Sequence, residues 1–195
     1  MLNIIGEEDT LRKKVWNTLN LIQANQLFVH SKNLEINYYD DKKNRTSKII
    51  LPEILSLCML NALVPNSAML LVGGHGGGKT TLVKLLGRMF TGMRLDEIES
   101  SIVRGHPQLT EEKLTGTLKL GKLMKDGIEE VVWRQFITGF WKIIDEVNRL
   151  TPYSQDILLS LLAEGKVKYY DAITTIEKYT LYGTINPQDV GTFEW

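Results

Sequence analysis

Apolar residues at helical spacing open the chain and predict one long helix from Glu8 to His30. The residues on its apolar face are Leu11, Val15, Leu19 and Ile22. The stretch Lys32–Lys48 is polar and irregular, and its charges of both signs favour a solvated loop. A second helix is expected from Pro52, which suits a first helical turn, to Leu63. It is apolar on nearly every side, as buried helices are.

From Ala68 onward, short apolar runs alternate with amphipathic segments. Three runs have the length and composition of buried strands: Ala68–Val72, Phe140–Ile144 and Tyr179–Ile185. Two helices are expected between them, one over Lys79–Phe90 and one that ends near Ala163. Thr151 and Pro152 supply the N-cap and the first turn of the second helix. Strands that alternate with helices predict an α/β fold with a parallel sheet covered by helices.

Composition and charge narrow the class of protein. The 195 residues contain 23 Lys and Arg against 23 Asp and Glu, so the formal net charge of zero gives no bulk argument for nucleic acid or an anionic membrane. The single cysteine, Cys58, excludes an internal disulfide and suits a reducing compartment. Neither a signal peptide nor a membrane-crossing apolar run is visible. We therefore expect a soluble, cytoplasmic globular protein.

The segment Gly73–Thr80 matches the phosphate-loop pattern G-x-x-x-x-G-K-[ST] and lies between a predicted strand and a predicted helix. Glycines let backbone amides approach a phosphate closely, and the start of the next helix adds its positive dipole end. Lys79 is expected to reach the β and γ oxygens of a nucleotide, and Thr80 to bind Mg²⁺. The predicted nucleotide-binding residues here are Gly73, Gly74, His75, Gly76, Gly77, Gly78, Lys79, Thr80 and Thr81. Among them, His75 is expected to be a solvent-facing spacer.

Polar residues follow the other two predicted strands. Asp145 and Glu146 come directly after the second strand, and Asn186 closes the third. Asp145 could share Mg²⁺ with Thr80, while Glu146 could polarise an attacking water. Asn186 could orient that water, or it could simply form an Asn-Pro turn. The expected catalytic residues are thus Lys79, Glu146 and Asn186, and the expected metal ligands are Thr80 and Asp145.

Taken together, these residues resemble an AAA+ ATPase, and specifically its MoxR branch. The matching segments are Ile4–Glu8, Gly73–Thr80, Thr115–Thr117, Asp145–Pro152, Gln155, Leu158-Leu159, Glu164–Val167, Asn186-Pro187 and Gly191-Thr192. The D-E-x-N-R run of Asp145–Arg149 is the most family-specific part. The resemblance covers most of the chain except residues 31–66, which look like an insertion that includes the buried helix.

The resemblance implies a three-layer αβα sandwich of the P-loop type, with a parallel sheet in the order 2-3-4-1. Residues 1–30 would form the N-terminal helix and the adenine side, with Ile5 and Gly6 lining the adenine pocket, and residues 67–195 would form the ATPase core. The family's helix-2 insert would span 118–137, and Lys125-Asp126-Gly127 is also a plausible hairpin turn on sequence grounds. A hairpin would span 167–178.

In rings of this family the two hairpins contact the client, so Lys119, Lys122 and Lys125 could touch a partner, although a solvated hairpin is the plainer interpretation. Arg149 would act across a subunit boundary or pair with a nearby acid, and the sequence leaves both open.

The chain departs from the family at its end. The arginine finger, fifth strand, helical lid and sensor 2 arginine all follow the Gly191-Thr192 region in the family, whereas this sequence stops at Trp195. The sequence is either a fragment of a longer protein, cut before the fifth strand, or a degenerate relative, and we expect the fragment. Such a fragment should bind nucleotide but hydrolyse it poorly by itself.

The function expected from these motifs is Mg²⁺-dependent ATP hydrolysis that remodels or matures a protein client, in a homo-oligomeric, hexameric ring. The client is not identified by the sequence. A small-molecule P-loop kinase is an alternative, although no Arg-rich lid segment occurs late in the chain. A nucleic-acid translocase of the related helicase branch is another, against which zero net charge weighs. A scaffold that binds nucleotide without hydrolysis is a third.

Overall fold

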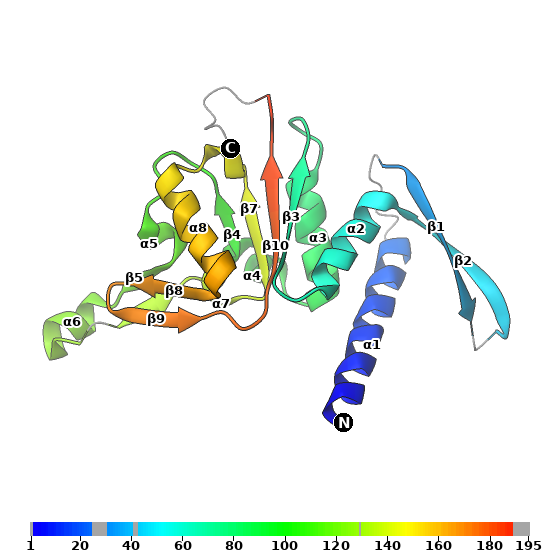
Figure 1. Cartoon of the computed structure of the whole chain (residues 1–195), viewed down its shortest axis with the longest axis horizontal. Helices are drawn as coiled ribbons and strands as arrows, with labels where there is room; N and C mark the ends of the chain where they lie inside the picture. The colour runs from blue at the N-terminus through cyan, green and yellow to red at the C-terminus, as the bar shows by residue number, and fades with distance from the viewer. Residues whose placement is uncertain (1, 25–30, 41–42, 129, 189–195) are drawn as a thin grey trace. The chain divides into compact units, whose positions relative to one another are not determined.

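The computed structural model describes residues 2–24, 31–40, 43–128 and 130–188. The chain divides into two compact units, Met1–Val64 and Pro65–Trp195. We call them the N-terminal unit and the sheet unit, and each is described by itself (Figure 1). Among the described helices, none combines the length and the apolar character that a membrane span requires.

The N-terminal unit consists of two helices and a β-hairpin. Helix α1 (Leu2–Ala24) begins earlier than predicted, and residues 25–30 of the predicted helix lie outside the described residues. Strands β1 (Asn33–Asp40) and β2 (Arg45–Pro52) pair antiparallel along their whole length. Helix α2 (Glu53–Leu63) packs against both strands. Because Leu57 and Leu60 of α2 are exposed, this helix is buried on one side rather than nearly all round as predicted.

The hairpin corrects the prediction of a loop over Lys32–Lys48. Its register places Glu35 opposite Ile50 and Asp40 opposite Arg45, and Lys43 lies in the turn between them. Asp41 and Lys42 of the charge run lie outside the described residues. Lys48 reaches across the pair to Glu35, with 2.5 Å between Nζ and Oε2. The prediction was wrong because the pattern of one strand does not reveal the cross-strand partners that stabilise it.

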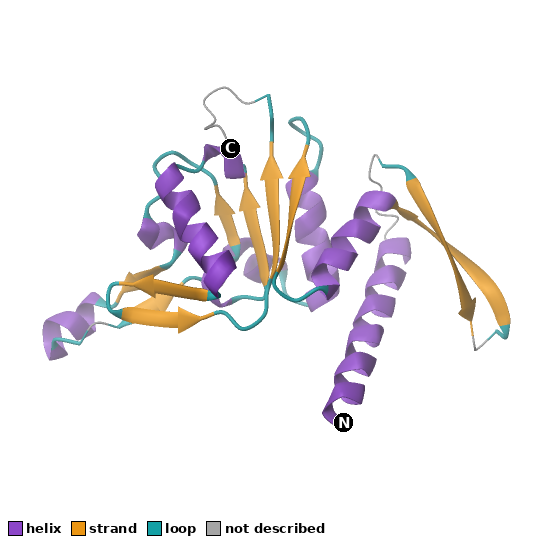
Figure 2. Ribbon diagram, viewed as in Figure 1, coloured by secondary structure: helices purple, strands orange, loops and turns teal. Residues whose placement is uncertain are grey.

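The sheet unit is built on a four-stranded parallel sheet, which confirms the predicted α/β fold and strand order. Its strands are β3 (Ser67–Val72), β4 (Ile102–Arg104), β7 (Trp141–Asp145) and β10 (Thr180–Ile185), arranged as β3-β10-β7-β4 (Figure 2). Trp141 pairs with Thr180 and Asp145 with Arg104, so these strands end at one edge. As an end strand of the described sheet, β3 leaves Leu70 and Val72 exposed instead of burying them as predicted.

Helices cover both faces of this sheet (Figures 1 and 2). The larger ones are α3 (Lys79–Thr91) and α4 (Leu95–Ser100) on one side and α8 (Pro152–Glu164) on the other. Shorter elements follow the strands: α5 (Glu111–Leu114), α7 (Gln135–Thr138) and the 3-10 turn η1 (Val147–Arg149). Helix α8 begins as predicted, because the Thr151 hydroxyl accepts the Ser154 backbone N–H and Pro152 occupies the first turn.

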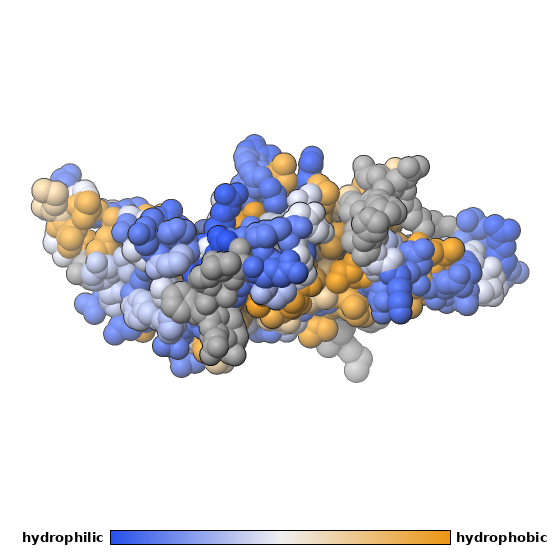
Figure 3. All heavy atoms as spheres, turned by 90° about the horizontal axis from the view of Figure 1, so that it is seen from above, coloured by the Kyte–Doolittle hydropathy of each residue, from blue (hydrophilic) through white to orange (hydrophobic). Residues whose placement is uncertain are grey.

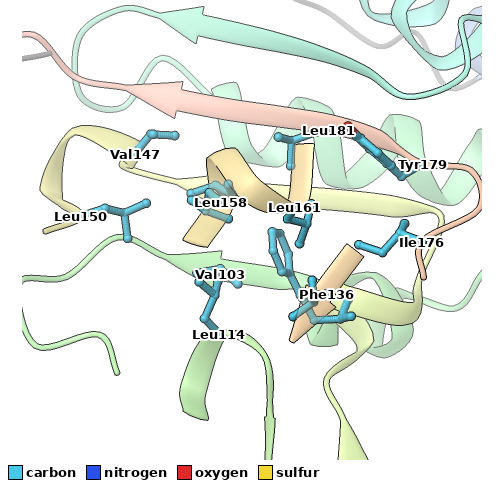
Figure 4. Packing of buried hydrophobic residues seen from close by; sticks show 13 residues of the cluster. Val103, Leu114, Phe136, Val147, Leu150, Leu158, Leu161, Ile176, Tyr179 and Leu181 are labelled. Carbon is cyan, nitrogen blue, oxygen red and sulfur yellow. The ribbon is translucent and has the colours of Figure 1, made fainter. Parts of the chain in front are cut away.

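A buried cluster fills the space between α8 and the sheet. It draws residues from strands, helices and the last hairpin, including Val103, Leu114, Phe136, Val147, Leu150, Leu158, Leu161, Ile176, Tyr179 and Leu181 (Figure 4). On the opposite face the Trp141 ring stacks on Tyr182, with 4.8 Å between centroids, and packs against Phe90. Gly87 of α3 is required there, since a Cβ at that position would lie 2.5 Å from Trp141 Nε1.

Two hairpins project from the sheet unit. Strands β5 (Gly116–Leu118) and β6 (Val131–Trp133) pair antiparallel around helix α6 (Leu120–Asp126), and β8 (Lys166–Tyr169) pairs with β9 (Ala172–Thr175) as predicted for residues 167–178. The predicted turn at Lys125-Asp126-Gly127 is instead the end of α6. Gly127 has φ 67° and its N–H donates to the Leu123 carbonyl, the geometry of a helix C-terminus. A glycine after polar residues is typical of both structures.

Lys142 of β7 is fully buried on the α8 side of the sheet. Its ammonium donates to the carbonyl oxygens of Phe136, Ile137 and Gly139 at 2.5–2.7 Å, and so caps the C-terminal end of α7. Burial lowers the pKa of Lys142 from 10.5 to about 7. The protonation state of Lys142, and with it the way this lysine caps α7, therefore depends on pH.

The free energy of unfolding should rise with pH between the pKa of Lys142 in the folded chain and its pKa in the unfolded chain. Between pH 7 and 10.5 the unfolded chain holds the lysine proton while the folded chain releases it, so raising the pH favours folding. The free energy of unfolding, measured by urea denaturation from pH 7.5 to 9, should increase by up to about 1.4 kcal/mol per pH unit more in the wild type than in Lys142→Met. Because other groups titrate alike in both proteins, parallel pH dependences would contradict this role of Lys142.

Candidate functional site

The phosphate loop connects β3 to α3 in a conformation that its glycines permit. Gly76 and Gly78 have φ near 70°, in the left-handed region, and Gly78 lies immediately before the first residue of α3. The Lys79 ammonium folds back to donate to the carbonyl oxygens of Gly73 and Gly74, at 2.7 and 2.8 Å. These two bonds hold the cation over the loop, close to where a phosphate would meet the helix start.

The Asp145 carboxylate, at the end of β7, joins the loop to the sheet. Its Oδ1 accepts hydrogen bonds from the hydroxyls of Thr80 at 2.5 Å and Thr184 at 2.6 Å. The two predicted Mg²⁺ ligands, Thr80 and Asp145, are therefore in direct contact. A hydroxyl that donates its proton to a carboxylate keeps its lone pairs for a cation, so this oxygen pair suits a hard divalent ion.

Glu146 occupies a strained position directly after the strand. Its backbone has φ 56°, in the left-handed region, and its N–H donates to the Thr184 hydroxyl at 3.0 Å. The side chain forms an ion pair with Arg149, with 3.1 Å between Oε2 and Nη1. Of the two possibilities that the sequence left open for Arg149, pairing with a nearby acid is present in this structure.

Asn186 lies beyond the end of β10, almost fully buried at 3% exposure. Its carbonyl oxygen accepts a hydrogen bond from Asn148 Nδ2 at 3.1 Å, and its side-chain oxygen accepts the Gln188 N–H at 3.3 Å. In the described chain, its Nδ2 has no hydrogen-bond partner. Because a buried amide donor without a partner is costly, this group is suited to a ligand oxygen or a water.

One cavity of about 250 Å³ brings most of these residues together. It is lined by His75, Gly76, Gly77, Gly78, Lys79, Thr80, Thr81, Asp145, Glu146, Thr184 and Asn186. Gly73 and Gly74 contribute through their bonds to Lys79. Ile5 and Gly6 lie in α1 of the N-terminal unit, so their adenine contact stays a prediction.

Two residues of the site were missed by sequence reasoning. Thr184 of β10 lies two positions before Asn186, and this period-two spacing from a predicted site residue is the signal that could have revealed it. Gly105 follows β4 and donates its N–H to the Asp145 carbonyl at 2.6 Å. A Cβ on Gly105 would lie 1.9 Å from the Glu146 carbonyl oxygen, so only glycine allows this approach.

The family of the chain follows from its sequence as well as from this geometry. Residues 68–194, well over half of the chain, match the AAA domain of the dynein-related subfamily. The chain belongs to this AAA family. The matched region begins in the first strand of the sheet and includes every predicted site residue except Ile5 and Gly6. A search of curated proteins found no match to the chain.

Solved structures share the fold of this AAA domain at low sequence identity. A proposed ATPase from Cytophaga hutchinsonii aligns over 100% of this chain and 51% of its own, with a TM-score of 0.59 and 18% identity. A chain from the complex between the magnesium chelatase subunits BchI and BchD aligns over 71% of this chain and 53% of its own, with a TM-score of 0.52 and 17% identity. This chain therefore spans about half the length of both, and the likeness extends to the fold alone.

Substitution of Gly105 tests the close packing of this residue against the backbone of Asp145 and Glu146. Gly105→Ala should destabilise the fold by about 1–3 kcal/mol or more, because the added methyl collides with the Glu146 carbonyl. Gly121→Ala in α6 is the matched control, since no atom outside its own neighbourhood lies within 4 Å of the new Cβ and alanine favours helix. Urea denaturation measures both variants, and equal stabilities would show that the sheet end tolerates displacement of Glu146.

Proposed function

We propose that the chain binds ATP with Mg²⁺ and hydrolyses it, as a MoxR-like AAA+ ATPase that remodels or matures a protein client. One observation carries the proposal. A single cavity joins a phosphate loop, an Asp-Glu pair and a buried asparagine with a free amide donor. Each of these groups has a defined task in phosphoryl transfer, and their convergence from three separate strand ends favours that chemistry.

Each residue has a role that follows from its position in the cavity. The loop amides and Lys79 neutralise charge on the phosphates, because the ammonium exchanges its two carbonyl acceptors for phosphate oxygens. Glu146 orients and polarises the attacking water. Asn186 Nδ2 donates to that water or to the γ-phosphate, which satisfies its unpaired N–H. The strained backbone at Glu146 is consistent with a residue fixed for chemistry rather than for stability.

Thr80 and Asp145 would hold Mg²⁺, which supplies charge neutralisation between the β- and γ-phosphates when it is bound. Their 2.5 Å contact sets the hydroxyl and the carboxylate side by side at the foot of the loop. The Thr184 hydroxyl donates to the same carboxylate oxygen, Oδ1, so neither threonine hydroxyl donates to Oδ2 of Asp145. Thr80, Asp145 and Thr184 all contribute oxygen atoms to the lining of the 250 Å³ cavity, which we call the nucleotide cavity.

The two hairpins supply the surface for a client. Leu120, Met124, Ile128 and Val132 of the α6 hairpin are exposed, with Met124 at 87%, and apolar atoms gather at this end of the molecule in Figure 3. An exposed apolar group of this kind suits contact with another protein. A cytoplasmic, homo-oligomeric ring is proposed with it. The magnesium chelatase neighbour, whose structure is a complex of two subunits, supports assembly of such domains.

The alternatives are weaker on specific grounds. A small-molecule kinase would use an acceptor site in place of water activation, whereas Glu146 and Asn186, the two residues proposed to act on water, line the same cavity. A nucleic-acid translocase would need several cations along one surface, and the chain has zero net charge. Release of inorganic phosphate without any acceptor distinguishes hydrolysis from a kinase reaction.

The first test removes the proposed water-polarising carboxylate. Glu146→Gln should bind a fluorescent ATP analogue within about twofold of the wild type yet lose about 100-fold or more in phosphate release, because an amide cannot accept the proton. Unchanged phosphate release would show that Glu146 does not polarise the water, whereas a wild type that binds the analogue but releases no phosphate would favour the scaffold alternative.

The second test addresses nucleotide binding itself. Lys79→Ala removes the only cation that the phosphate loop presents within the described residues, and the affinity for ATP-Mg²⁺ should fall by about tenfold or more in a calorimetric titration. Lys84→Ala on the same helix is the control, since Lys84 pairs with Glu99 outside the nucleotide cavity. Equal affinities for both variants would exclude a phosphate at this loop.

A further inference from the structure

The outer edge of β4 is open in the described sheet. On its other side β4 meets β7, where the Ser101 carbonyl accepts from the Ile143 N–H and the Gly105 N–H donates to the Asp145 carbonyl. Backbone groups alternate in direction along a strand, so those of Ile102 and Arg104 point away from β7. No described strand lies beyond them, because β4 ends the order β3-β10-β7-β4. A short row of backbone donors and acceptors therefore faces outward.

A cavity of about 490 Å³ lies directly beside this edge. It is lined by Lys84, Glu99, Ile102, Val103, Arg104, His106, Gln108, Leu109 and Lys113. Glu99 is already paired with Lys84, at 2.5 Å between Oε1 and Nζ. Within the described residues, Arg104 and Lys113 have no carboxylate partner. Two cations that lack a carboxylate partner in the described part of the chain therefore line this cavity.

Further donors and an apolar floor complete the cavity. His106 Nδ1 accepts the Gln108 N–H at 3.0 Å, so the proton of the neutral ring is on Nε2, which is then a donor. Ile102, Val103 and Leu109 add apolar surface among the polar groups. The lining is suited to a ligand that carries carboxylates next to apolar side chains.

We propose that the edge of β4 binds an extended acidic segment of a protein partner. This segment adds to the sheet as a short strand next to β4. Main-chain bonds to Ile102 and Arg104 would align it, and alternate side chains would direct carboxylates at Arg104 and Lys113. A short edge strand with an arginine disfavours pairing with neutral or basic strands and so selects an acidic one. None of the cavity's lining residues belongs to the nucleotide cavity, and the proposal stands apart from ATP hydrolysis.

Other anions match this surface less well. A single phosphate fills little of a 490 Å³ cavity and makes no use of the strand edge. Nucleic acid binding draws its affinity from about six to ten phosphate contacts, whereas two free cations beside Glu99 offer few. A peptide uses the cations, the backbone edge and the apolar floor together.

Peptide binding tests the proposal directly. The probe is a fluorescein-labelled, end-capped hexapeptide of alternating Asp and Val, titrated with the wild-type chain by fluorescence anisotropy at low salt. Saturable binding with a dissociation constant of about 10–100 µM is expected. The double variant Arg104→Glu, Lys113→Glu should bind about tenfold or more weakly, since two attractions become repulsions. If that variant fails to fold, as judged by circular dichroism, Arg104→Gln serves in its place with a smaller loss.

Controls separate strand addition at β4 from general attraction. Lys13→Glu with Lys14→Glu changes net charge equally at exposed positions of α1 outside this cavity and should leave affinity within about twofold. Methylation of alternate peptide nitrogens should abolish binding, and Lys79→Ala should not alter it. Any one of four results would overturn the proposal. These are equal loss of affinity in both double variants, undiminished binding of the methylated peptide, binding that does not saturate, and tighter binding of a single-stranded oligonucleotide of equal charge.

Discussion

The sheet unit is organised by one carboxylate, that of Asp145. Its Oδ1 accepts hydroxyl protons from Thr80 at the start of α3 and from Thr184 near the end of β10, so three elements meet at one oxygen. This is possible only because β3, β7 and β10 are parallel and end at the same edge of the sheet. The chemistry of the site thus depends on strand direction before it depends on any single side chain.

Much of this edge could be predicted because each part has a strong local signal. The phosphate loop combines glycines that need positive φ with a lysine and a threonine at fixed spacing, between a strand and a helix. Asp145 and Asn186 were found because each follows an apolar run, and the parallel fold then brings them to one edge. Thr184 carries only the weaker signal of its period-two spacing from Asn186, and Gly105 carries none, since the importance of both arises from contacts between strands that are distant in the sequence.

The errors arise where a local sequence pattern leaves out a partner or fits two structures equally well. The strands of the N-terminal hairpin look irregular singly, and their alternation becomes clear only in register, where Ile49 and Leu51 are buried. Gly127 was assigned to a turn although it ends α6, because a glycine with positive φ satisfies both structures equally. Lys142 was read as part of an apolar strand, and its bonds to three carbonyls of the α7 region could not be foreseen from β7 alone.

Both hydroxyls that meet Asp145 belong to threonines, and this choice has an entropic consequence. A β-branched side chain has few accessible χ1 rotamers, so Thr80 and Thr184 lose little conformational freedom when their hydroxyls are fixed. A serine at either position would offer the same oxygen on a freer side chain. The restricted rotamers of Thr80 and Thr184 therefore reduce the side-chain entropy that is lost when this part of the site becomes ordered, so a cation that bound here would lose mainly its own hydration.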